Sequence, residues 1–145
     1  MNVFGESLED VMLAKEFDVS KIAVGAQIKR ENVTNYLSGK CVPILPHAVK
    51  IADFCGCSLD YLVGLADDPQ YGDYSPADQK FYEHYLAAIK ARGITHYRVA
   101  KDLGVNFNIY RKWRDGAIPS LKVFTALAKY LGVTADSLVG RERLK

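Results

Sequence analysis

Residues 94–105 read ITHYRVAKDLGV, and this short stretch decides the fold. Thr95 is a residue type that caps the start of a helix, and Gly104 is the type that most often ends one. Between them, Val99 and Leu103 recur at the spacing of one helical face. The stretch therefore predicts a short helix that ends in a tight turn.

A second short helix is predicted directly after this turn. Asn106 can cap its start, and the pair Asp115-Gly116 stops it after about Arg114. A helix, a turn of about three or four residues and a second helix form a motif that can place the second helix in a major groove.

Helix signals continue on both sides of this pair. Upstream, apolar residues within 81–89 recur at helical spacing, and Gly93 follows them. Downstream, a fourth helix opens at Ser120 and closes at Gly132, and Thr134 caps a short fifth helix. No strand alternation of useful length interrupts the series.

The same arrangement occurs twice in the chain. A proline followed by two glycines at fixed intervals stands at Pro43, Gly56 and Gly64 and, with identical intervals, at Pro119, Gly132 and Gly140. Matching residues of the two copies, such as Gly39 and Gly116, are 77 positions apart upstream of the prolines, whereas Pro43 and Pro119 are 76 positions apart. One extra residue therefore sits in the loop after Gly39, as a duplicated domain tolerates. In the first copy we expect helices to begin near Ser7, Ser20, Lys29, Leu45 and Ser58.

These signals predict an all-α protein made of two small five-helix bundles joined by a short linker. We expect the first bundle to span residues 1–66 and the second to span residues 78–145. Residues 67–77 contain two prolines and a glycine and show no apolar period, which is typical of a linker.

Charge is divided unevenly between the two halves. The net charge of the chain is only +2, yet basic residues outnumber acidic ones by 13 to 6 within 78–145, so the part from 1 to 77 carries a net −5. A basic half joined to an acidic half suggests that one half meets a polyanion, although surface charge can also be uneven by chance.

Other functional classes leave no pattern in the sequence. No apolar run approaches the ~20 residues that span a bilayer, and no signal pattern opens the chain, so we expect a cytoplasmic protein without membrane contact. Cys55 and Cys57 have no second pair to form a metal site, and we expect them to pack in a core. No catalytic motif is present; we therefore expect no enzyme activity, no cofactor and no metal.

The second copy resembles the Cro and lambda-repressor-like (XRE-type) helix-turn-helix family. The resemblance rests on residues 94–105 and on three further segments: WRDG at 113–116, PSL at 119–121 and LGVTADSLVG at 131–140. The first copy resembles the family more weakly, for example through YLSGK at 36–40 and SLDYLVG at 58–64. The resemblance implies five-helix bundles whose third helix reads double-stranded DNA, in bacterial or phage transcriptional regulators that often act as dimers.

The two copies depart from the family pattern in different ways. The second helix of the family often begins with Ser or Thr followed by Gln, and the place of this Gln is taken by His96 in the second copy and by Val19 in the first. His96 can still donate to a phosphate, whereas Val19 cannot. The turn before the third helix has the usual glycine at Gly104, but the first copy has Gln27. The first copy is therefore either a modified reader or mainly a dimerisation domain.

Eight residues of the second copy are expected to touch DNA. Asn108 has the paired donor and acceptor that suit adenine, and Phe107 suits either a thymine methyl or the core. Arg98 and Arg114 are expected at phosphates, which position a protein without reading sequence. The full set is His96, Arg98, Asn106, Phe107, Asn108, Arg111, Lys112 and Arg114.

The matching positions of the first copy are more mixed in charge. Arg30 and Asn35 are chemically suited to read bases, and Glu31 can accept from cytosine or repel a phosphate. The full set is Lys29, Arg30, Glu31, Thr34, Asn35 and Lys40.

Two functions from different classes stay open. The leading interpretation is sequence-specific binding of double-stranded DNA by a transcriptional regulator or repressor, with recognition helices in the major groove. The alternative is a protein-interaction module, such as an antitoxin or a regulatory subunit, in which the first domain mediates dimerisation or binds a partner. A homodimer and a protein partner of the first domain therefore stay open beside DNA.

Overall fold

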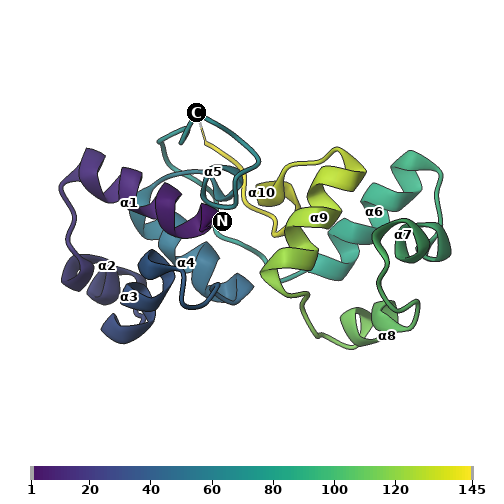
Figure 1. Ribbon diagram of the computed structural model, residues 1–145. Coiled ribbons are helices and arrows are strands. Elements are labelled where there is room, and N and C mark those ends of the chain that lie inside the picture. The colour runs from purple at the N-terminus through teal and green to yellow at the C-terminus, as the bar shows by residue number, and fades with distance from the viewer. Residues whose placement is uncertain (1, 145) are drawn as a thin grey trace. The chain divides into compact units, whose positions relative to one another are not determined.

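The computed structural model describes residues 2–144, which form ten helices and no strand (Figure 1). The prediction of an all-α fold is confirmed. The chain divides into two compact units: of the described residues, unit 1 comprises 2–75 together with 143–144, and unit 2 comprises 76–142. No helix in the described part of the chain is long and apolar enough to cross a membrane.

Unit 1 is built around an aliphatic core. Its helices are α1 (Val3–Lys15), α2 (Val19–Ala26), α3 (Arg30–Ser38), α4 (Leu45–Cys55) and α5 (Leu59–Leu62). The fully buried side chains include Leu8, Val11, Ile22, Val33, Ile51, Leu59 and Leu62. The expected start of the first helix near Ser7 is wrong. Helix α1 begins at Val3 because the side chain of Asn2 accepts a hydrogen bond from the Gly5 N–H and caps the helix.

Unit 2 has a more aromatic core. Its helices are α6 (Phe81–Arg92), α7 (His96–Leu103), α8 (Ile109–Arg114), α9 (Leu121–Leu131) and α10 (Ala135–Leu138). The largest fully buried side chains are Tyr85, Phe124, Leu127 and Leu138, and Leu131 is almost as deeply buried. Helix α8 starts later than expected, because Asn106 does not cap it. The Asn106 side chain instead accepts from the Asn108 N–H at 2.8 Å, in a turn that precedes the helix.

Each unit contains an edge-to-face aromatic pair, and the two pairs occupy matching positions of the sequence repeat. Phe4 lies edge-to-face against Tyr36 in unit 1, with ring centroids 6.2 Å apart and planes at 82°. Phe81 lies in the same way against Trp113 in unit 2, at 5.4 Å and 89°. Phe81 follows Phe4 by 77 positions and Trp113 follows Tyr36 by 77 positions, which is the offset between the two copies of the sequence repeat in this region.

The turns that follow α2 and α7 are also closed by the same hydrogen bond. After α2 the Ile28 N–H donates to the Ala23 carbonyl at 3.0 Å, and after α7 the Val105 N–H donates to the Ala100 carbonyl at 3.0 Å. A matched bond of this kind means that the backbone leaves the two helices along the same path.

Gln27 adopts the left-handed conformation for which Gly104 is suited. The backbone angles are φ 58° and ψ 48° at Gln27, against φ 69° and ψ 28° at Gly104. For a residue with a Cβ, this conformation costs about 1–2 kcal/mol. The missing glycine in the first copy therefore makes the turn less stable without changing its shape.

Much of the stretch that the sequence predicts as a linker is hydrogen-bonded to unit 1. The Ser58 N–H donates to the Pro69 carbonyl at 2.8 Å, and the Gly72 N–H donates to the Gly56 carbonyl at 2.9 Å. These bonds attach the segment to the turn between α4 and α5, so that the part of the chain up to residue 75 belongs to unit 1.

Candidate nucleic-acid interface

Trp113 anchors α8 to the core of unit 2. Its side chain is only 3% exposed, and its ring lies edge-on to Phe81 and to Tyr85, at centroid distances of 5.4 and 5.2 Å. Trp113 is therefore a core residue and is not available to stack on a base. Because this ring fixes the inner face of α8, the other predicted contact residues on and before this helix remain exposed: Asn106, Phe107, Asn108, Arg111, Lys112 and Arg114.

Arg98 is exposed but held by a neighbouring carboxylate. Its Nε donates to Asp102, one turn further along α7, at 3.0 Å, and the Tyr130 hydroxyl donates to the same carboxylate from α9. The hydrogen bonds from Tyr130 and Arg98 lower the pKa of Asp102, so the carboxylate keeps its charge. A phosphate that approaches Arg98 therefore competes with Asp102 for this guanidinium.

His96 is built into the aromatic layer between α6 and α8. Its ring stacks on Tyr110 with centroids 4.4 Å apart, and its Nδ1 lies 2.9 Å from the Tyr85 hydroxyl. Burial lowers the pKa of His96, which favours the neutral ring at pH 7. A phosphate could therefore receive a hydrogen bond from the neutral His96 ring but no attraction to a positive charge. The stacked His96 ring also holds Tyr110 of α8 in position.

Unit 2 should lose stability as the pH falls below 6.5. The folded state holds the pKa of His96 below the ordinary value of 6.5, so in this range the unfolded chain binds a proton that the folded chain does not. The urea midpoint of unfolding can be measured by the fluorescence of Trp113. As the pH is lowered from 7.5 to 5, we expect this midpoint to decrease more steeply in the wild type than in His96→Gln. The variant His47→Gln, altered in unit 1, should keep the steep fall, and equal slopes in wild type and His96→Gln would contradict the prediction.

Tyr97 is a candidate contact residue that the sequence analysis did not include. Its side chain is 64% exposed, and its ring lies edge-to-face against Phe107, which is 42% exposed. Phe107 is thus a surface residue and not a core residue. The only sequence signal for Tyr97 is its position just after the N-cap Thr95, where the outward face of α7 begins.

Most of the predicted contact residues of unit 1 are exposed around α3. Lys29, Arg30, Glu31, Thr34 and Lys40 are exposed, and Asn35 is half-buried. The guanidinium of Arg30 donates from Nη1 to the hydroxyl of Ser20 on α2 at 2.9 Å. Arg30 is thereby directed by the helix that precedes the turn, while the Thr34 hydroxyl donates to the backbone carbonyl of Arg30 at 3.1 Å.

The cysteines pack as expected. Cys55 and Cys57 are buried cysteines, and burial raises the pKa of Cys55 to about 11. In the part of the chain that the structure describes, no three His, Cys, Asp or Glu side chains come together in a group that could hold a metal ion.

One comparison with known proteins gives a match. A family model described as helix-turn-helix matches residues 86–138, from within α6 to the end of α10. This family is one of DNA-binding domains of the XRE type, so the resemblance is confirmed for the segment that contains α7 and α8, and the matched segment occurs once. No curated protein and no solved structure matches the chain.

Proposed function

We propose that this chain is a transcriptional regulator or repressor that binds a specific double-stranded DNA sequence through two helix-turn-helix units in tandem. The observation that carries the proposal is the exposed polar and basic row on and before α8, which lies within the segment that the family model matches. We further propose a bacterial or phage protein that acts in the cytoplasm and has no enzymatic activity.

In unit 2 the proposed roles follow from chemistry and exposure. Asn108 can donate to N7 and accept from N6 of an adenine through its amide, which offers both a donor and an acceptor. Lys112 and Arg111 can reach guanine edges or phosphates from the last turn of α8. Arg98 and Arg114, whose side chains are 66% and 54% exposed, would meet phosphates in exchange for their ion pairs with Asp102 and Asp115.

Unit 1 is proposed as a second reader. The matched aromatic pair and the matched turn described above support one architecture for both units. Arg30 and Asn35 would read bases from α3, and Lys29 and Lys40 would meet phosphates. Two readers in one chain gain affinity from effective concentration, because the second binds intramolecularly once the first is engaged.

Selection from random duplex DNA with the full chain, at two salt concentrations, tests this proposal. We expect enrichment of a motif in two parts, whose affinity falls with salt at a log–log slope of about −0.9 for each phosphate contact. Binding that scarcely responds to salt, or enrichment of no motif at all, would contradict it. If the motif has a single part that is unchanged by the pair Arg30→Ala and Asn35→Ala, the tandem-reader part of the proposal fails.

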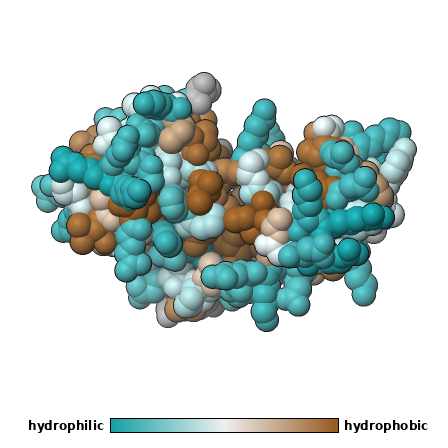
Figure 2. Space-filling model, turned by 90° about the horizontal axis from the view of Figure 1, so that it is seen from below, coloured by the Kyte–Doolittle hydropathy of each residue, from teal (hydrophilic) through white to brown (hydrophobic). Residues whose placement is uncertain are grey.

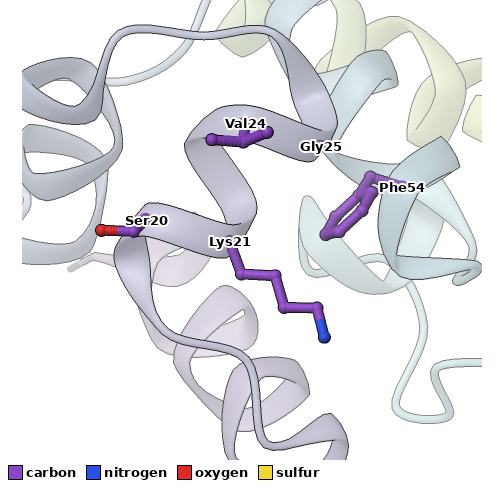
Figure 3. Close-up of a pocket in the computed structure, with 5 residues that line it drawn as sticks. All are labelled: Ser20, Lys21, Val24, Gly25 and Phe54. Carbon is purple, nitrogen blue, oxygen red and sulfur yellow. The ribbon is translucent and has the colours of Figure 1, made fainter.

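A second candidate function, binding of a protein partner by unit 1, is favoured by apolar surface there. Leu13 and Val24 are 72% and 79% exposed. Figure 3 shows a shallow hollow beside Val24, where the ring of Phe54 faces α2 at Gly25. In Figure 2, brown hydrophobic residues reach the surface among the hydrophilic ones. A separate groove between α1 and α3 is lined by the apolar residues Met12, Leu13, Phe17 and Leu37 and by the polar residues Glu9, Thr34 and Ser38.

Two double variants of unit 1 distinguish the two candidate functions. If unit 1 serves a protein partner or a homodimer, Leu13→Ser with Val24→Ser should abolish that complex in size-exclusion and cross-linking measurements and leave DNA affinity unchanged. If unit 1 reads DNA, Arg30→Ala with Asn35→Ala should weaken DNA binding and leave the oligomeric state unchanged.

A further inference from the structure

Two aromatic side chains on the exposed side of unit 2 form a pair outside the core. Tyr97 on α7 and Phe107 in the turn before α8 meet edge-to-face with centroids 6.2 Å apart, and Phe107 also lies 5.2 Å from Tyr110. Tyr97 and Phe107 are nevertheless 64% and 42% exposed. Clustered apolar side chains that remain in contact with water commonly mark a surface that another molecule covers.

The same two positions also touch in unit 1, but with polar chemistry. Ser20 and Arg30 are the counterparts of Tyr97 and Phe107 in the sequence repeat, and the Arg30 guanidinium donates to the Ser20 hydroxyl at 2.9 Å. In each unit a residue at the start of the third helix, or just before it, is thus supported by a residue of the second helix. Only the chemistry of the supported residue differs: a cation in unit 1 and an aromatic ring in unit 2.

The charge around the aromatic pair suits a duplex. Arg111 lies with its guanidinium carbon 5.9 Å from the Tyr110 ring centroid, and Lys112 and Arg98 are exposed on the same two helices. These cations favour a polyanion over an apolar protein surface. The apolar feature that a base pair presents in the major groove is the C5-methyl group of thymine, since the other groups there are polar donors and acceptors.

We propose that Phe107 makes unit 2 select a thymine at one position of its DNA site by covering the C5-methyl group, with Tyr97 as a positioning residue that holds the Phe107 ring. The inference rests on the proposed DNA binding and deepens it by naming the base that this unit recognises. It also distinguishes the two units, because Arg30 offers a cation at the matching place.

The test replaces each thymine of the enriched duplex in turn by deoxyuridine, which lacks only the C5-methyl group, and measures the affinity of the full chain. At one thymine we expect the substitution to lower the affinity about fourfold, because burying one methyl-sized group contributes about 0.8 kcal/mol. In Phe107→Ala the thymine and deoxyuridine duplexes should bind equally. Tyr97→Ala should lower the thymine-to-deoxyuridine ratio, and Tyr97→Phe, which keeps the ring, should restore it.

Ile118→Ala is the matched control, since Ile118 is a 46% exposed apolar residue of unit 2 outside the pair. It should keep the fourfold ratio. A chain that enriches a duplex but tolerates deoxyuridine at every position, or a ratio that survives in Phe107→Ala, overturns this inference alone. A chain that enriches no duplex overturns the proposed function together with it.

Discussion

Alanine at both Asn108 and Lys112 should weaken the binding of the full chain to its enriched duplex by about a hundredfold. A good side-chain contact to a base edge is worth about 1–3 kcal/mol, and each 1.4 kcal/mol corresponds to about tenfold in affinity. Two contacts in the lower half of that range give this loss. Both side chains are exposed, so the unfolding midpoint should stay where it is in the wild type.

Electrophoretic mobility shift or fluorescence anisotropy measures this loss of affinity, and one variant serves as its control. Lys90→Ala removes an exposed positive charge from α6, which is outside the proposed contact residues, and should change the affinity by less than about threefold, because such a cation contributes only through the screened field. The pair Arg30→Ala and Asn35→Ala instead removes the proposed base-reading side chains of unit 1, and it should also weaken binding if unit 1 reads the duplex. A loss of less than threefold in the Asn108 and Lys112 variant would show that α8 does not read the duplex.

Arg141→Ala should lower the free energy of unfolding of unit 2 by about 3–5 kcal/mol. The Arg141 side chain is fully buried, and its Nη1 donates to the carboxylate of Asp136, whose side chain is 10% exposed. Removing one partner of a buried pair leaves the other charge without its counterion, which costs about 3–5 kcal/mol. The backbone N–H of Arg141 also donates to the Asp136 carbonyl at 2.8 Å, a bond that alanine keeps.

Urea unfolding followed by Trp113 fluorescence measures this loss, because Trp113 is the single tryptophan of the chain and lies in the core of unit 2. Arg114→Ala is the matched control. Its ion pair with Asp115 is 54% and 72% exposed at the two side chains, so we expect a loss of under about 1 kcal/mol. Equal losses in the two variants would show that burial does not govern the strength of the Arg141 pair.

Local signals in the sequence were sufficient to predict most of the helices. Thr95, Ser120 and Thr134 cap α7, α9 and α10 with their side-chain oxygens, and Gly104 and Gly132 end α7 and α9 in the left-handed conformation. Caps act on backbone groups within about three residues, so the sequence alone records them. The starts of α1 and α8 differ from those expected, because the Asn2 side chain caps α1 earlier and because Asn106 stabilises a turn instead of the helix.

The sequence by itself thus determined the all-α class, the order of the helices and the exposed polar row of α8, because each depends on periodicity and on local hydrogen bonds. Only the tertiary structure decided which side chains are available to a ligand. It placed His96 in an aromatic stack, brought the Tyr130 hydroxyl of α9 to Asp102 and brought Tyr97 against Phe107. The packing of α7 against its neighbours sets these contacts and the burial that goes with them, and sequence spacing carries no record of either.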